Sequence, residues 1–155
     1  MQMDTTKSKS LIPAYQRLVK LIESHADELS RNLLQDLRKR DSTSTFRTYD
    51  EKEIYERAFN VYSHLGKWIS RETTKDEIAK HYTALGAKRH QEGFALSEII
   101  QALIMTRRHL WLKVLAEGFL DTALDLNQAL NLNNRVMLFF DRAIFYVAVG
   151  YQRDK

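Results

Sequence analysis

The segment between Gly93 and Gly118 constrains the fold most, because it contains no helix breaker and is apolar around most of a helical wheel. At 3.6 residues per turn, its apolar side chains fall on two arcs. The wide arc holds Ile99, Ile100, Leu103, Ile104, Leu110, Trp111, Val114 and Leu115, and the narrow arc holds Ala102, Met105, His109, Leu112 and Ala116. A helix that is apolar on two sides is buried on two sides. The segment therefore predicts a central helix, or one that packs inward on one side and against another subunit on the other.

The rest of the chain also predicts helices, because apolar residues recur every three or four positions and no useful run alternates like a strand. One proline and five glycines in 155 residues leave few turns. We expect helices at about 10–40, 50–70, 74–92, 96–117 and 121–151, with a candidate break at 131–134 in the last. The sequence thus predicts a disordered tail, residues 1–9, and a single all-α domain, residues 10–155. We expect this domain to be globin-like or a helical bundle of five or more helices.

Several helix ends carry recognisable signals. Asp50 with Glu53 three residues later has the pattern of a capping box, and Thr73 or Thr74 is expected to cap the third helix. Gly93 is expected just past the end of that helix, where a left-handed residue commonly stands. These signals mark where the predicted helices begin and end.

Charge and composition exclude several classes of protein. There is no cysteine, which excludes disulfides and thiolate metal sites and suits a cytoplasmic protein. The net charge is +4, and the densest basic run, residues 38–40, falls at an expected helix C-terminus, where cations complement the helix dipole. We therefore predict no nucleic-acid binding. The longest apolar run, residues 136–151, contains Asp141 and Arg142 and is too short to span a bilayer, so no membrane span is predicted.

Metal and haem binding depend on the histidines. These are His25, His64, His81, His90 and His109. No two are three or four residues apart, so no pair within one helix can bind a metal, and no metal site is predicted. Haem needs only one axial histidine, and His109 or, second, His25 could supply it from an apolar helix face. A histidine on such a face is more often an ordinary core or interface residue. We therefore expect no cofactor, with haem as the alternative.

No catalytic signature is present: the sequence lacks a nucleophile elbow, a phosphate loop and a paired-carboxylate motif. We expect no enzyme activity. A small helical enzyme built from distant residues, or an anion-binding protein, remains a further alternative.

Two arginines, Arg89 and Arg107, fall where their helices should bury apolar surface. A buried guanidinium needs a partner. Either each arginine pairs with Asp141 or Glu92, or extends to the surface, or the two bind an anionic ligand. The structural explanation is favoured for both. Asp141, at the edge of the apolar face of the last helix, is the best acidic candidate.

The narrow arc of the helix at 96–117 also suggests a dimer. We predict that Met105, His109, Leu112 and Ala116 help form its interface. A last helix of about 30 residues would be about 45 Å long, which is longer than one small domain needs. Helices of this kind often continue into a dimer partner or an output domain.

The run LGAKRHQEGFALSEIIQALIMTRRHLW, residues 85–111, and the ending FFDRAIFYVAVGY, residues 139–151, resemble the N-terminal sensor domain of RsbRD-type proteins. That family occurs in bacterial stress signalling and in some histidine kinases. The resemblance implies an all-helical sensory domain, related to haem-free globin-like dimers that signal to a C-terminal output domain. Because the sequence ends at Lys155 with no output domain, we expect a stand-alone protein or an excised fragment. The resemblance implies no catalytic residue and no particular ligand.

These observations lead to one hypothesis of function. We expect a non-catalytic regulatory sensor that dimerises and relays a signal through its long last helix to an output domain or partner signalling protein. The alternatives are a haem-binding globin-like sensor, and a small helical enzyme or anion-binding protein.

Overall fold

A computed structural model describes residues 15–117 and 122–154. Every regular element in these ranges is helical, which confirms the predicted all-α fold of five or more helices. The elements are α2 (Gln16–Ser24), α3 (Ala26–Lys39), the 3-10 helix η1 (Asp41–Arg47), α4 (Glu51–Ser63), α5 (Leu65–Trp68), α6 (Lys75–Gln91), α7 (Leu96–Ala116) and α8 (Ala123–Arg153). The predicted tail, the predicted start of the first helix near residue 10 and the opening of the last helix at Asp121 lie outside the described residues.

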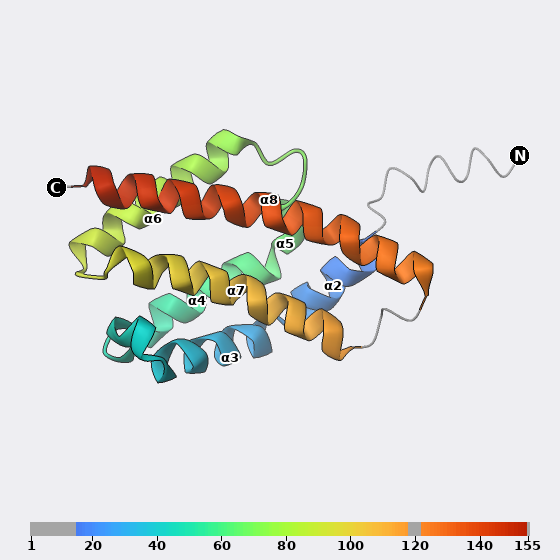
Figure 1. Cartoon of the computed structure of the whole chain (residues 1–155), viewed down its shortest axis with the longest axis horizontal. Coiled ribbons are helices and arrows are strands. Elements are labelled where there is room, and N and C mark those ends of the chain that lie inside the picture. The colour runs from blue at the N-terminus through green and yellow to red at the C-terminus, as the bar shows by residue number, and fades with distance from the viewer. Residues whose placement is uncertain (1–14, 118–121, 155) are drawn as a thin grey trace, which may run out of the picture.

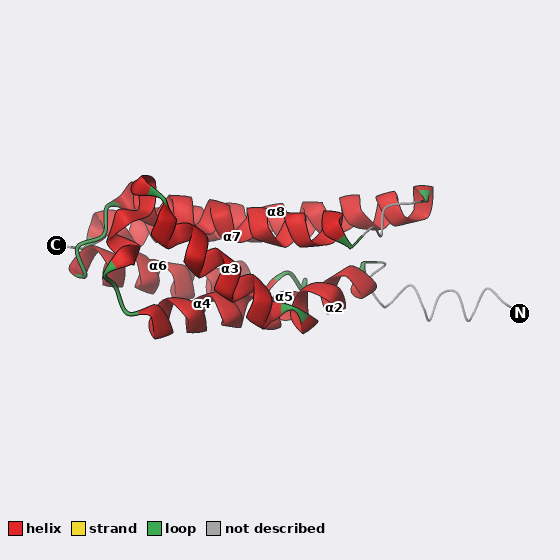
Figure 2. Cartoon of the chain, turned by 90° about the horizontal axis from the view of Figure 1, so that it is seen from below, coloured by secondary structure: helices red, strands yellow, loops and turns green. Residues whose placement is uncertain are grey.

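The helices form two layers. Helices α7 and α8 run side by side along the near face of the molecule in Figure 1. In the view turned by 90° (Figure 2), α7 and α8 lie together on one side of the molecule, and α2, α4 and α5 lie on the other. The two layers enclose one hydrophobic core, to which every helix contributes buried side chains. Buried apolar area of this kind is the main source of folding free energy in a domain of this size.

Two predicted long helices are each broken by a Ser-His pair. The first is divided at His25 into α2 and α3, and the second at His64 into α4 and α5. At each break the imidazole Nδ1 lies near the carbonyl oxygen four residues earlier, at 2.8 Å for His25 and 3.2 Å for His64. The preceding serine hydroxyl also donates to a carbonyl of the same helix. Side-chain contacts of this kind compete with the helical backbone hydrogen bonds, which accounts for the two breaks.

The predicted helix ends are largely confirmed. Asp50 accepts a hydrogen bond from the Lys52 amide at 3.0 Å, and Thr74 accepts one from the Glu77 amide at 3.1 Å. Gly93 has a φ of 86°, the left-handed conformation expected after a helix. The candidate break at 131–134 is wrong, because α8 is one continuous helix of 31 residues.

Helices α6 and α8 approach so closely that their backbones touch at two glycines. A Cβ atom added to Gly86 would lie 2.0 Å from the carbonyl oxygen of Val147, and one added to Gly150 would lie 2.0 Å from that of Thr83. Only glycine, which has no Cβ atom, fits at such a crossing. The two glycines therefore hold the C-terminal half of α8 against α6.

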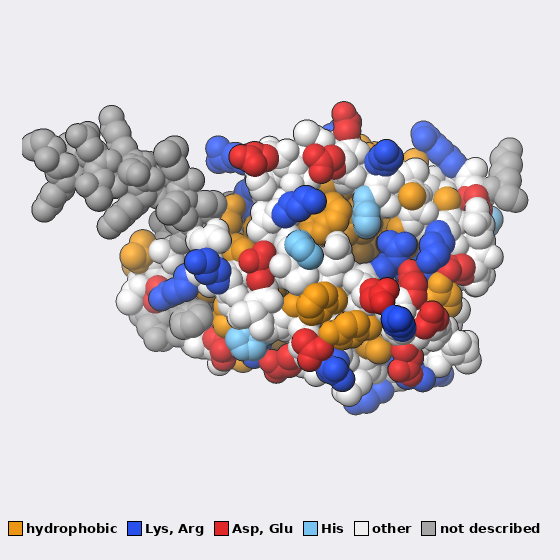
Figure 3. Space-filling view, turned by 180° about the vertical axis from the view of Figure 1, so that it is seen from behind, with side chains coloured by type: hydrophobic (Ala, Val, Ile, Leu, Met, Phe, Trp, Pro, Cys, Tyr) orange, Lys and Arg blue, Asp and Glu red, His pale blue; other side chains and the backbone are white. Residues whose placement is uncertain are grey.

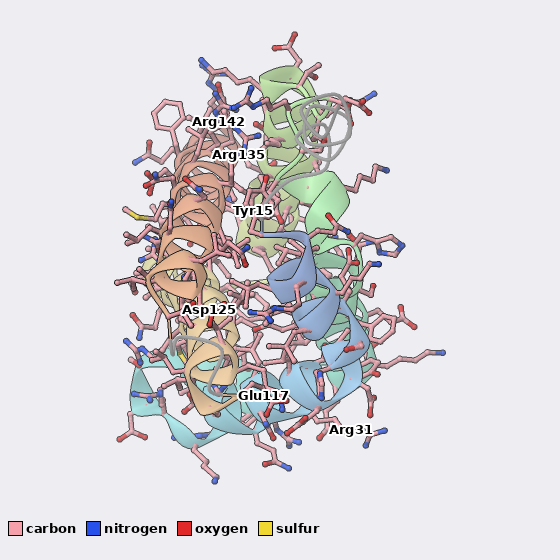
Figure 4. All side chains as sticks on the ribbon, turned by 90° about the vertical axis from the view of Figure 1, so that its right-hand side faces the viewer. Tyr15, Arg31, Glu117, Asp125, Arg135 and Arg142 are labelled. Carbon is pink, nitrogen blue, oxygen red and sulfur yellow. The ribbon has the colours of Figure 1, made fainter. Side chains whose placement is uncertain are left out.

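Polar contacts attach the other half of α8 to the second layer. Asp125 accepts a hydrogen bond from Arg17 of α2 at 2.9 Å. Arg135 donates to the carbonyl oxygen of Ile69, just after α5, at 2.9 Å from Nε. Both α8 side chains lie on the side of that helix that faces the second layer (Figure 4). No helix within 15–117 and 122–154 is both long and apolar enough to cross a membrane.

Candidate functional site

Arg89 is a buried charge at the end of the apolar face of α6. This face consists of Ile78, Tyr82 and Leu85, all buried, followed by Arg89 in the last turn. The Arg89 side chain is only 4% exposed. Burying a guanidinium costs free energy unless it is paired and hydrogen-bonded, so its surroundings are the first candidate for a functional site.

The guanidinium is paired on both sides. Arg89 Nη2 donates to Glu53 Oε2 at 2.8 Å, and Nη1 donates to Glu92 Oε1 at 2.8 Å and to the Tyr49 hydroxyl at 3.2 Å. Its central carbon lies 5.2 Å from the centre of the Tyr49 ring and 5.3 Å from that of Phe94, within the range of cation–π contacts. The two aromatic rings and two carboxylates thus enclose the charge.

The network extends from Arg89 towards solvent. Glu53 also accepts hydrogen bonds from Arg57 at 2.7 Å and from Lys88 at 3.0 Å, while the Tyr49 hydroxyl donates to Glu92. Burial alone would raise the pKa of Glu53, but the hydrogen bonds from three cations outweigh it and lower the pKa to about 2. Burial and the hydrogen bond to Glu92 raise the pKa of Tyr49 to about 12. The charge of Arg89 is therefore balanced within the protein by Glu53 and Glu92.

An apolar cavity lies next to this network, between α3, α4, α6 and α7. Its volume is about 340 Å³, at the lower end of the range for small-molecule sites. The apolar side chains that line it are Leu33, Leu37, Phe46, Ile54, Ala58, Val61, Leu85, Ile99, Ala102 and Leu103. Seen from behind, the molecule has a hollow near the middle of its face, with hydrophobic side chains at the floor and histidine and basic side chains at the rim (Figure 3). This cavity is the second candidate site.

Polar residues also line the cavity, and Glu53, Glu56 and Arg89 are among them. Arg57, Asn60 and His81 lie among its more exposed lining residues, and Tyr82 and Thr106 among its buried ones. Burial and the nearby Arg57 lower the pKa of His81, so the imidazole is neutral at physiological pH. The Tyr82 hydroxyl is buried and has no hydrogen-bond partner among the described residues. An apolar cavity with a few convergent polar groups is typical of a binding site.

Asp141 does not reach either arginine. It is exposed on α8, and no ion pair within the described residues joins it to Arg89 or Arg107. Arg107 itself is half-buried. A helical wheel gives the angle of a side chain but not which side of the helix is covered. Here α8 packs through Ala143, Val147 and Gly150, which are buried, and Asp141 projects away from them.

The structure corrects half of the predicted dimer interface. Met105 is fully buried, and His109 Nε2 lies 2.9 Å from Asp36 Oδ2 of α3, so both side chains face the interior of the same subunit. Leu112 and Ala116, in contrast, are exposed. The narrow arc is therefore divided: Met105 and His109 face the interior of the same subunit, and only its last turns are exposed.

The two candidate haem ligands lie apart from the cavity. His109 pairs with Asp36, and His25 closes helix α2. Neither is among the residues that line the cavity. His81, which does line it, was not a candidate from the sequence. Within the described residues, no three His, Cys, Asp or Glu side chains gather in a group that could hold a metal ion.

Glu53 has a role that the sequence pattern does not predict. It stands where a capping box needs an acid, but its carboxylate binds Arg89, Arg57 and Lys88. The signal for this role was the basic pair Lys88-Arg89 with Glu92 on the neighbouring turn of α6. The partner helix could not be chosen from the sequence, since Glu53 and Arg89 are 36 residues apart.

The low pKa of Glu53 predicts acid sensitivity. Its carboxyl has a pKa of about 2 in the folded protein against an ordinary value of 4.5. The stability it contributes is therefore complete above about pH 4.5 and is lost as the pH falls towards 2. Free energies of unfolding from urea titrations across this range should fall with pH in the wild type and fall less steeply in Glu53→Gln. Glu56→Gln, an exposed change on the same helix, is the control, and identical slopes in all three proteins would contradict the prediction.

The fold and the site together indicate the class of protein to which the chain belongs. The chain forms an all-helical domain with a balanced buried arginine network and a small apolar cavity, features of a binding or regulatory domain. The family described as "RsbT co-antagonist protein rsbRD N-terminal domain" matches residues 53–155, from α4 to the end of the chain. The protein belongs to this family, a family of stress-signalling regulatory domains. No curated protein and no solved structure matches the chain.

Proposed function

We propose that the protein is a non-catalytic regulatory sensor that forms a homodimer through α7 and α8 and relays its signal along α8. The observation that carries the proposal is the distribution of exposed large hydrophobic side chains. On α7 and α8 these are Leu112, Leu115, Leu124, Leu126, Leu130, Met137, Leu138 and Phe145; elsewhere in the described residues Phe59 is exposed to a similar degree. A concentrated apolar surface of this kind usually marks an interaction site.

The outer face of α8 is suited to a second copy of the same helix. Leu130 and Met137 are seven residues apart, so they lie on one face, and they are 55% and 42% exposed. Asn134 and Asp141 lie on the same outer face and are also exposed. A few polar residues within an apolar seam fix the register of paired helices. A two-fold dimer would pair this face with itself.

The long α8 also supplies a route for the signal. Its C-terminal half is fixed to α6 by the glycine contacts, and α6 carries Arg89, Tyr82 and His81 beside the cavity. A shift of α6 therefore moves α8, and with it the proposed dimer face. The proposed recipient is an output domain or a partner signalling protein in the cytoplasm, in line with the co-antagonist role in the family's description. The proposal includes no resident cofactor.

Mutation of the outer face should separate the subunits. Changing both Leu130 and Met137 to glutamate places four like charges at the proposed interface, and light scattering at micromolar concentration should change from dimer to monomer. We expect dimer affinity to fall at least about tenfold. Because both side chains are exposed in the subunit, the folding stability should change by no more than about 0.5 kcal/mol per site.

Phe59→Glu is the matched control, since Phe59 is 37% exposed on α4, away from α7 and α8. It should leave the mass unchanged. A monomeric wild-type protein, or a double variant as dimeric as the wild type, would refute the proposed interface.

A further inference from the structure

We propose that the cavity between α4 and α6 binds a small, uncharged, mainly apolar molecule, whose oxygen atom accepts a hydrogen bond from the Tyr82 hydroxyl. Tyr82 lines this cavity, and its side chain is buried. Its hydroxyl has no hydrogen-bond partner among the described residues. The indole nitrogen of Trp111 shares that property but does not line the cavity.

An unpaired buried hydroxyl is unusual enough to need an explanation, because nearly all buried polar atoms in proteins are hydrogen-bonded. A second buried tyrosine in the same chain provides a comparison. Tyr62 is equally buried, and its hydroxyl donates to the Thr106 carbonyl oxygen at 2.7 Å. Burial raises the pKa of Tyr82, which keeps the phenol protonated and therefore a donor. A ligand with an acceptor oxygen would satisfy that donor.

The charges around the cavity favour a neutral ligand over an anion. Arg57 is at the rim, but it already donates to Glu53 at 2.7 Å. Arg89 is occupied by Glu53 and Glu92. His81 is uncharged at physiological pH, because burial and Arg57 lower its pKa. Each arginine that lines the cavity has a carboxylate partner, and the acidic residues Glu53 and Glu56 in the lining also disfavour an anion. The proposed recognition therefore rests on apolar contact and on the Tyr82 hydroxyl.

The size of the cavity suits a small ligand of one or two substituted rings or an equivalent branched chain. Its volume is about 340 Å³, and half of the residues that line it are aliphatic. A ligand there would contact α3, α4, α6 and α7 together, because each contributes lining side chains. The effect of a bound ligand on signalling depends on the proposed function. The binding of a ligand to the cavity does not depend on it.

Two probes of nearly the same shape test the hydrogen bond. Acetophenone carries a carbonyl group where ethylbenzene carries a methylene. Titration of the isotope-labelled protein, followed by NMR of its methyl groups, gives both dissociation constants and the location of each probe. The wild type should bind acetophenone about five- to tenfold more tightly, the usual effect of one added hydrogen bond, with shifts at Ile54 and Leu85. Tyr82→Phe should remove this preference and still bind ethylbenzene.

Tyr62→Phe is the matched control. It also removes a buried hydroxyl, but one that is already satisfied outside the ligand, so the preference for acetophenone should persist. The proposal is overturned if neither probe binds, if the preference is absent in the wild type, as a trapped water on Tyr82 would cause, or if it survives in Tyr82→Phe. Repeating the titration with the Leu130→Glu, Met137→Glu double variant separates the two proposals. Cavity binding should persist there whether or not the wild type is a dimer.

Discussion

Replacing Gly150 with alanine should lower the free energy of unfolding by about 3 kcal/mol or more, at the upper end of the cost of overpacking. The added Cβ would lie 2.0 Å from the Thr83 carbonyl oxygen, and 2.7 and 2.9 Å from two further backbone atoms of the same residue. No side-chain rotation can relieve contacts with backbone, so α6 and α8 would have to separate. Such a separation would also disturb the buried contacts on both sides of the crossing.

Whether Gly150→Ala lowers or raises the free energy of unfolding shows whether the two helices are in close contact there. Alanine is a better helix former than glycine by about 1 kcal/mol, so a helix without the close contact would be stabilised by the same change. Gly86→Ala should resemble Gly150→Ala, because its Cβ would lie 2.0 Å from the Val147 carbonyl oxygen. Thermal and urea unfolding measure both variants.

Gly66→Ala is the control. Its nearest neighbours would be side-chain atoms of Val19 and Glu23, at 3.2 and 3.4 Å, which can shift slightly. Its stability should change by no more than about 1 kcal/mol. An increase in stability for Gly150→Ala would show that the two helices are not in contact there.

The approximate positions of the helical segments and several of their ends could be predicted because they depend on local signals. Asp50, Thr74 and Gly93 act within a few residues of themselves. The breaks at His25 and His64 are also local, but the sequence does not predict them because Ser-His pairs carry no strong helix-ending signal. The candidate break in α8 was wrong because asparagines at 131, 133 and 134 lower helix propensity only slightly, and tertiary packing on Leu132 and Val136 outweighs it.

The site depended on packing that periodicity does not encode. The wheel placed Arg89 on a buried face but could not select Glu53, which belongs to another helix. The same limitation led to Asp141, which has a suitable angle but faces outward. The cavity could not be predicted at all, because an unfilled volume is a property of four packed helices. Its only sequence signal was a tyrosine and a histidine, Tyr82 and His81, on the apolar side of α6.

Arg89→Ala should lower the free energy of unfolding by about 3 kcal/mol, the lower end of the cost of breaking a buried ion pair. The lower end applies because Glu53 keeps Arg57 and Lys88 as partners, and both carboxylates remain about one-fifth exposed. The arginine stem also leaves the space between the rings of Tyr49 and Phe94. Arg89→Lys should lose less, since it keeps the charge but not the two-sided hydrogen bonding.

Arg107→Ala separates the role of Arg89 from that of an arginine on an apolar helix face in general. The sequence places both arginines on apolar helix faces. In the structure, however, Arg107 is half-buried and has no ion pair within the described residues. Arg107→Ala should therefore lower the free energy of unfolding by no more than about 1 kcal/mol. Equal losses for the two variants, measured by urea unfolding, would contradict the ion network as the source of the effect. Adding Glu53→Gln to Arg89→Ala should cost less than the two single losses summed, because the second change removes a carboxylate that has already lost its buried partner. A strictly additive double variant would mean that Arg89 stabilises the fold through its stem alone.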